Sequence, residues 1–207
     1  MNIVRVTYTD AVQREWLHEF YDNVLVGLFN EELIPDFDTF FGQVQEPSRA
    51  KNWYCMLAMA GAKPVGGITA EYMPESNCCI IEFLQTMMNY QTMQEQLLSA
   101  MVQSLHAMHR KAKHIFIELV PNAGNMSSGF YRDWCKRIEM KYVTPPIRED
   151  ADPGFGLELC VVDELIGEIH SSEVVSFINE YFRTSFSGVD IRPYLPKITG
   201  VLKVSPI

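Results

Sequence analysis

The sequence predicts a mixed α/β (α+β) fold in which a mainly antiparallel central sheet is flanked by helices. The chain has 207 residues, of which 47% are hydrophobic and 12% aromatic, so it can bury a sizeable core. Segments with the two-residue period of strands alternate with segments whose apolar residues recur every three or four positions, as in amphipathic helices. Three successive strands, 53–59, 65–72 and 78–86, are separated by short turns, which is typical of an antiparallel meander.

The segment before this meander is predicted to contain one strand and two helices. These elements are a strand at 3–8 (IVRVTY), a helix at about 10–29 and a short helix at 37–44. Thr9 or Asp10 can cap the first helix, because both side chains accept hydrogen bonds from first-turn N–H groups. Within the meander, Gly66 and Gly67 indicate a β-bulge or the close approach of another group.

The rest of the chain is predicted to alternate helices and strands. The expected elements are a helix at 97–108, a strand at 114–120, a helix at 125–137, strands at 142–147 and 156–162, and a helix at 173–183. Because a helix joins them, strands 78–86 and 114–120 are expected to run parallel. No repeat or low-complexity linker interrupts the chain. Residues 1–162 are therefore interpreted as one domain, and residues 163–207 as a C-terminal helical extension packed on it.

The composition argues against several classes of protein. The chain carries 17 basic and 26 acidic residues, a formal charge of −9, and without a basic stripe no nucleic-acid partner is expected. No apolar run reaches the roughly 18 residues that suggest a membrane-spanning helix, and the N-terminus lacks a signal-peptide pattern. We therefore expect a cytoplasmic protein without membrane contact.

Cysteine and histidine usage predicts neither a disulfide framework nor a metal site. The five cysteines are scattered, without a CxxC pair. His106, His109 and His114 lie in or beside a basic helix end, which is expected to be exposed. Cationic side chains are favoured there by the helix dipole, so metal binding is not needed to explain them.

Over about residues 2–162, the order of these elements resembles the GNAT fold of acyl-CoA-dependent N-acetyltransferases. VGGITAEYMPESNCCIIEFLQTM resembles the third and fourth strands of that fold, and FYRDW resembles the FYxxxGF signature that opens its fourth helix. KYVTPPI, followed by a polar loop and GLELCVV, resembles a bacterial subgroup with a YVQPP-like segment and a C-terminal helical extension. The resemblance implies acetyl-CoA as the cosubstrate.

The resemblance also implies where coenzyme A binds. In the family, the fourth strand separates from the fifth, and its exposed backbone binds the pantetheine arm. On this chain the task falls to Glu82, Phe83 and Leu84. Asn125 matches a family asparagine that contacts the same arm.

The loop that binds the pyrophosphate in the family departs from the usual pattern here. The family motif R/Q-x-x-G-x-G/A aligns with NYQTMQ, which contains no glycine, although glycine is what lets backbone approach phosphate closely. Either the N–H groups at the helix start still bind pyrophosphate, or the loop is closed and Glu95 repels it. The candidate cofactor-binding residues of the loop are Asn89, Gln91, Thr92, Met93 and Gln94.

Three residues are the main candidates for catalysis. Tyr131 matches the family tyrosine that protonates the leaving thiolate, although the glycine and phenylalanine that should follow the motif are absent. Glu118 and Glu82 lie on strands where family members place the base that accepts the amine proton, and Glu71 is a weaker candidate. Burial beside an apolar side chain such as Phe116 would raise the pKa of such a carboxyl group.

The sequence therefore predicts an N-acetyltransferase that transfers an acetyl or acyl group from coenzyme A to an amine of a small molecule or peptide. The amine would attack directly, and a backbone N–H near Leu84 would stabilise the oxyanion. The alternative is a non-catalytic binding or regulatory module that kept the fold and lost acetyl-CoA binding. The C-terminal extension would pack on the domain or mediate a homodimer.

Overall fold

A computed structural model describes residues 1–8, 10–28, 34–45, 50–87, 90, 92–110, 112–121, 133–146, 155–162, 167–186 and 188–207. The chain divides into two compact units. Unit 1 consists of Met1–Tyr72 and Ile81–Arg110, and unit 2 of Met73–Ile80 and Lys111–Ile207. The described residues beyond 162 belong to unit 2 together with the strands that precede them. The boundary expected after residue 162 stays a prediction.

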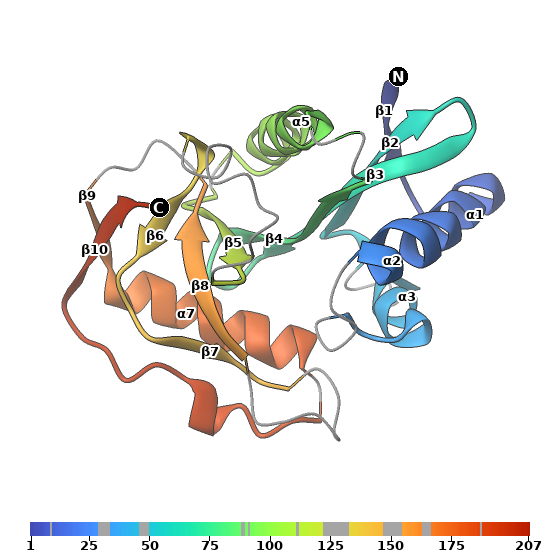
Figure 1. Ribbon diagram of the computed structural model, residues 1–207. Coiled ribbons are helices and arrows are strands. Elements are labelled where there is room, and N and C mark those ends of the chain that lie inside the picture. Colours follow the sequence, from blue (N-terminus) through green and yellow to red (C-terminus); the bar gives the residue numbers. More distant parts are fainter. Residues whose placement is uncertain are drawn as a thin grey trace. The chain divides into compact units, whose positions relative to one another are not determined.

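Unit 1 has the strand order β1-β2-β3-β4, with β1/β2 and β2/β3 antiparallel (Figure 1). Its elements are β1 (Asn2–Val6), α1 (Ala11–Phe20), the π-helical turn η1 (Tyr21–Leu25), α2 (Val26–Leu28), α3 (Phe37–Gln45), β2 (Trp53–Ala60), β3 (Lys63–Met73), β4 (Cys78–Thr86) and α5 (Met93–Met108). The Asp10 carboxylate accepts the N–H of Gln13 at 2.9 Å and caps α1, as predicted. The helix expected at 10–29 is thus α1, which widens into η1 and continues as α2.

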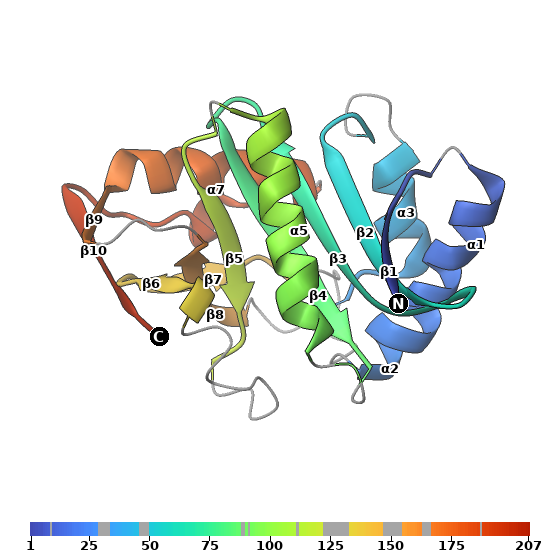
Figure 2. The ribbon, with the colours of Figure 1, turned by 90° about the horizontal axis from the view of Figure 1, so that it is seen from above.

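β2 is buried on both faces, which explains its continuous apolar sequence. Trp53, Cys55, Leu57 and Met59 join an apolar cluster built from α1, η1 and α3. Because side chains alternate along a strand, the residues between them face the other side. Figure 2 shows α5 in front of β4 and running roughly along it, and α1–α3 lie on the face of the unit 1 strands away from α5.

Both predictions for the glycine pair of β3 are confirmed. The β2/β3 register shifts between Ala58 and Met59, which marks a bulge. A Cβ on Gly66 would lie 2.6 Å from Thr86 Cγ2, so β4 approaches closely there. A Cβ on Gly67 would lie 2.7 Å from Phe20 Cε2 and 2.8 Å from Leu57 Cδ2. The absence of side chains at these positions lets α1 and β4 pack against β3.

Gly67→Ala should lower the free energy of unfolding by about 1–3 kcal/mol, because the added methyl group overpacks a core that has no room for it. Thermal denaturation measures the loss. Gly27→Ala is the matched control, since the nearest atom to a Cβ there is the Asp22 carbonyl oxygen at 3.9 Å. Alanine favours a helix, so the control should melt at or above the wild-type temperature. A Gly67→Ala protein that melts like wild type would contradict the close packing.

Unit 2 contains the start of β4 and a set of strands in the order β5-β8-β6-β10-β9, with β7 also paired to β8. Its elements are β5 (Ile115–Leu119), β6 (Lys136–Ile138), β7 (Tyr142–Thr144), β8 (Phe155–Val161), β9 (Gly167–His170), α7 (Ser171–Ser185), the 3-10 turn η4 (Arg192–Tyr194) and β10 (Val201–Pro206). The predicted C-terminal helix is α7, which lies along one face of these strands (Figure 1). The strands β9 and β10 were not predicted.

One predicted helix end is wrong. The helix expected at 125–137 was extended too far, because residues 136–138 form β6, which pairs antiparallel with β8 and β10. Most of that expected helix lies outside the described residues. The mixed α/β class with a mainly antiparallel sheet is confirmed.

The parallel direction expected for β4 and β5 is supported by two hydrogen bonds at their starts. The Cys79 N–H donates to the His114 carbonyl at 2.9 Å, and the Lys113 N–H donates to the Asn77 carbonyl at 2.8 Å. The paired residues advance in the same direction along both segments. This is the arrangement that a helical crossover requires.

A buried carboxylate joins α7 to the turn between β3 and β4. Glu180 is 4% exposed, and its oxygens accept the backbone N–H groups of Glu75 at 2.8 Å and Ser76 at 2.6 Å. Arg183, one turn later on α7, pairs with the exposed carboxylate of Glu75. Asn77 completes the turn in the left-handed region, with φ 58°. α7 therefore fixes the conformation of this turn.

All five cysteines are free and buried. Burial raises the pKa of each thiol, to about 11 for Cys78 and to about 12 for Cys79 and Cys135. Within the described part of the chain, no helix combines the length and the apolar character needed to cross a bilayer.

Candidate active site

Glu118 is the centre of a polar group within the apolar core of unit 2. It lies on β5, where its two carboxylate oxygens have separate donors from different elements. The hydroxyl of Tyr142, on β7, donates to Oε1, and the hydroxyl of Tyr181, on α7, donates to Oε2 at 3.3 Å. Tyr142 and Tyr181 are buried, whereas Glu118 keeps part of its surface exposed. Each oxygen of the carboxyl group is therefore held by one phenol.

The environment of Glu118 raises the pKa of its carboxyl group to about 7. Burial is the larger cause, because an apolar surrounding disfavours the charged form, and the two tyrosine hydroxyls oppose it by donating to the carboxylate. Burial also holds the pKa of Tyr142 well above its usual range. The nearby charge of Glu118 is the second cause and raises this pKa further. Tyr142 thus remains a hydrogen-bond donor at every physiological pH.

Aromatic packing keeps the two phenols in place. The Tyr142 ring stacks on Phe182 at 5.9 Å, and the Tyr181 ring stacks on Phe177 at 5.7 Å with an interplanar angle of 5°. Phe177 stacks in turn on Phe116, with ring centroids 4.2 Å apart. The sequence-based expectation that apolar burial near Phe116 would raise a carboxyl pKa agrees with the value at Glu118.

The predicted pantetheine-binding residues lie on the unit 1 part of β4. Leu84 is buried, whereas Glu82 and Phe83 keep part of their surface exposed. The Phe83 ring meets Phe40 of α3 edge-on, with centroids 5.5 Å apart. Thr86, at the end of the strand, is 3% exposed, and its Oγ1 has no hydrogen-bond partner among the described residues.

The start of α5 is where the sequence predicted the pyrophosphate loop. Thr92 is the N-cap residue and is exposed, but its side chain makes no capping hydrogen bond. The N–H groups of the first turn thus lack this common partner. Met93 is 8% exposed, so only its backbone N–H is suited to a ligand. Gln94 is partly exposed, and Glu95 is exposed in the first turn.

Four predicted site residues lie outside the described residues. They are Asn89 and Gln91 of the loop, the asparagine Asn125, and the acid Tyr131. Their roles stay predictions.

Sequence reasoning missed both tyrosines that hold Glu118. Tyr142 lies in the KYVTPPI segment and Tyr181 in the helix predicted at 173–183, and neither was predicted as a site residue. A buried tyrosine needs a partner for its hydroxyl, and that requirement was the available signal.

The exposed position expected for His109 is wrong. Its ring stacks on Tyr72 with centroids 3.8 Å apart, and its Nε2 lies 2.6 Å from the Tyr54 hydroxyl. Partial burial lowers the pKa of His109. This histidine therefore anchors the end of α5 to β2 and β3.

The sequence matches no protein-family model and no curated protein. Solved structures match its fold. A protein from Bacteroides thetaiotaomicron assigned to the GNAT acetyltransferases has a TM-score of 0.60 and 18% identity, over 92% of this chain and 100% of its own. An acyl-CoA N-acyltransferase from Pseudomonas aeruginosa has a TM-score of 0.54 and 8% identity, over 79% of this chain and 100% of its own. An aminoglycoside 6'-acetyltransferase type Ii has a TM-score of 0.55 and 12% identity, over 79% of this chain and 96% of its own.

The chain therefore has the GNAT fold, as its motifs indicated. At these identities the likeness establishes the fold alone. What the chain does must be argued from its own residues.

Proposed function

We propose that the protein is an N-acetyltransferase that transfers an acetyl or acyl group from coenzyme A to the amine of a small molecule or peptide. The observation that carries the proposal is Glu118, a residue of β5 that keeps part of its surface exposed and whose carboxyl group has a pKa raised to about 7. A general base works best when its pKa lies near the working pH. GNAT enzymes place such a base on this strand. Here the strand carries Glu118, whose pKa lies near the working pH.

The described residues at the predicted cofactor site fit coenzyme A. The first turn of α5 offers N–H groups and the positive end of a 16-residue helix, which attract an anionic pyrophosphate even without glycine. Thr86 Oγ1 adds a buried polar atom with no described partner. Thr92, Met93 and Gln94 would hold the pyrophosphate, together with Asn89 and Gln91, while Glu82, Phe83, Leu84 and Asn125 would hold the pantetheine arm.

Acetyl-CoA would supply a thioester carbonyl activated for attack by an amine. Glu118 would accept the proton that the attacking amine loses, and Glu82 is the alternative base. Tyr131 would donate a proton to the departing thiolate. The backbone N–H near Leu84 would stabilise the oxyanion.

The acceptor is proposed to be an amine that is cationic in water. The formal charge of −9 suits the approach of such a molecule. One structural neighbour is described as an aminoglycoside acetyltransferase, so small polyamines and aminoglycosides are the first acceptors to screen, followed by short peptides with free amines. Residues beyond 162 are proposed to pack on the domain or to form a homodimer, and the protein is proposed to act in the cytoplasm.

Isothermal titration with acetyl-CoA tests the proposal. Binding is expected, and Gln94→Glu should weaken it roughly tenfold, because a new negative charge would face the pyrophosphate at a cost of about 1.4 kcal/mol. An acidic residue in the first turn favours the helix itself, so the variant should not lose stability.

Gln103→Glu is the matched control, since it adds the same charge at an exposed position in the second half of α5. If Gln94→Glu and the control bind acetyl-CoA with equal affinity, the start of α5 is not part of the cofactor site. If the wild-type protein does not bind acetyl-CoA, the proposed acetyltransferase function is wrong, and the alternative of a non-catalytic binding module is favoured. If binding occurs, Tyr131→Phe should lower turnover far more than affinity.

A further inference from the structure

We propose that Tyr142 and Tyr181 are positioning residues for the base Glu118: each phenol holds one oxygen of the carboxylate and so fixes the group that accepts the acceptor's proton. This inference rests on the proposed function. Its ground is the geometry, in which the two hydroxyls donate to different oxygens, Oε1 and Oε2, of the same carboxyl group.

The arrangement leaves the carboxylate able to act. Each carboxylate oxygen can accept two hydrogen bonds, so one phenol on each oxygen leaves room for a proton or for a donor from the acceptor. Glu118 keeps part of its surface exposed, whereas Tyr142 and Tyr181 are 3% and 5% exposed. The two phenols therefore occupy one acceptor position on each carboxylate oxygen, within a residue that keeps part of its surface exposed.

The phenols cannot easily turn away from Glu118. Their rings are stacked on Phe182 and Phe177, in a cluster of fully buried aromatic side chains. A carboxylate fixed by rigid donors needs less reorganisation when a proton arrives, which is the property that a preorganised base requires.

Other charged groups of the neighbouring elements are engaged elsewhere. On β8, Glu158 pairs with Arg137 of β6 at 3.2 Å. On α7, Glu180 binds the turn at Glu75 and Ser76. Three further groups near the ends of these elements interact with one another, since Glu173 at the start of α7 binds Lys113 at 2.9 Å and lies 3.6 Å from His114 before β5. Among the described residues of unit 2, the two phenols thus donate side-chain hydrogen bonds to Glu118, and they counter the effect of its burial on the pKa.

This assignment gives the C-terminal segment a part in the reaction. Tyr181 belongs to α7, beyond the residues that resemble the family core. It reaches Glu118 across 63 positions of sequence. A segment that would otherwise only pack on the domain therefore supplies a donor to the base.

The test is the titration of Glu118 by carbon NMR in protein labelled at the glutamate carboxyl carbons. The Glu118 signal is identified by its loss in Glu118→Gln. The wild-type midpoint is expected near pH 7. Tyr142→Phe and Tyr181→Phe each remove a donor that favours the carboxylate, so each should raise the midpoint, by about one pH unit for Tyr142→Phe. The rise should be smaller for Tyr181→Phe, because its hydrogen bond is long, at 3.3 Å.

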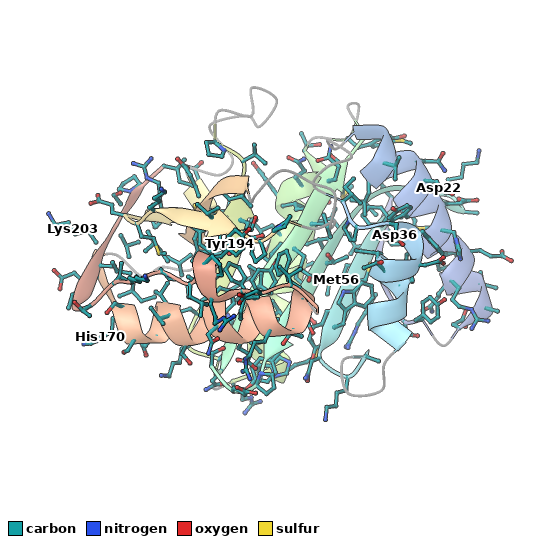
Figure 3. All side chains as sticks on the ribbon, turned by 90° about the horizontal axis from the view of Figure 1, so that it is seen from below. Asp22, Asp36, Met56, His170, Tyr194 and Lys203 are labelled. Atoms are coloured by element: carbon teal, nitrogen blue, oxygen red, sulfur yellow. The ribbon has the colours of Figure 1, made fainter. Side chains whose placement is uncertain are left out.

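Tyr194→Phe is the matched control. Tyr194 of η4 packs against the same apolar cluster (Figure 3), and no hydrogen bond from its hydroxyl to Glu118 occurs in the described structure. This variant should leave the midpoint unchanged. Each substitution keeps the ring, so circular dichroism should show an intact fold.

The activity readout separates a positioning role from a structural one. In Tyr142→Phe, the acidic limb of kcat/KM for the acceptor should move to higher pH together with the NMR midpoint, while the KM for acetyl-CoA stays unchanged. An unchanged NMR midpoint in Tyr142→Phe overturns the proposal, and so does a midpoint that moves without the limb. Failure of the proposed function is seen separately, as the absence of acetyl-CoA binding by the wild-type protein.

Discussion

Glu118→Gln should lower acetyl transfer by about 100- to 10,000-fold, the usual contribution of a general base, and leave the affinity for acetyl-CoA unchanged. Glutamine keeps the shape of the side chain but cannot accept the amine proton. Release of coenzyme A from acetyl-CoA in the presence of the amine acceptor, followed by a thiol reagent, measures the rate. The wild-type rate should fall as the pH drops through about 7, because protonated Glu118 cannot act as a base.

Glu158→Gln is the matched control for this substitution. Glu158 is a carboxylate on the adjacent strand β8 that pairs with Arg137 instead of with the tyrosines. Its loss should change the rate less than about threefold, as expected of a partly exposed ion pair. Full activity in Glu118→Gln together with loss of activity in Glu82→Gln would move the base to Glu82.

The same variant gives a stability readout with a definite sign. Because the folded state raises the pKa of Glu118 from 4.5 to about 7, the folded protein binds the proton more tightly than the unfolded chain. The contribution of Glu118 to stability is therefore complete below pH 4.5 and is lost as the pH rises through 7, by roughly 3 kcal/mol. Denaturant titration at pH 5 and pH 8 should show this loss in the wild type and a smaller one in Glu118→Gln.

Glu180→Ala should lower the free energy of unfolding by about 2–4 kcal/mol, because it leaves two backbone N–H groups without their charged acceptor and opens a cavity. The N–H groups are those of Glu75 and Ser76, at 2.8 and 2.6 Å from the carboxylate. Denaturant unfolding followed by circular dichroism measures the loss.

Two controls separate the buried contacts from the surface pair. Glu180→Gln keeps one acceptor oxygen and should cost about half as much. Glu75→Gln removes the exposed pair with Arg183 but keeps the backbone N–H, so it should cost less than about 1 kcal/mol. A larger loss in Glu75→Gln than in Glu180→Ala would show that the surface pair holds the turn.

The elements that could be predicted from the sequence are those with a strong local signal. β2, β4, α5 and α7 have long apolar runs or stripes, and Asp10 caps α1 as expected. β6, β9 and β10, of 3, 4 and 6 residues, were missed. Length alone is not the reason, because β1 and β5, of 5 residues each, were predicted. The conformation of the missed strands depends on partners far away in the chain, such as Val204 opposite Ile138.

In the candidate site, too, only the features with a local sequence signal could be predicted. Glu118 was predicted, together with Glu82, as a candidate base from its place on a strand, which is local information. Its pKa is raised by burial and lowered in part by hydrogen bonds from Tyr142 and Tyr181, which are 24 and 63 residues away. No sequence period indicates that these hydroxyls meet one carboxylate, so their effect on the pKa of Glu118 became visible only in the folded chain.

The burial of all five thiols makes them chemical reporters of local opening. Alkylation needs an exposed, ionised thiol, so a labelling rate measures how often the surrounding structure opens. Cys55 belongs to unit 1 and Cys160 to unit 2. Variants that keep only one of these two cysteines would therefore give a separate opening free energy for each unit. A single melting curve does not separate the two values.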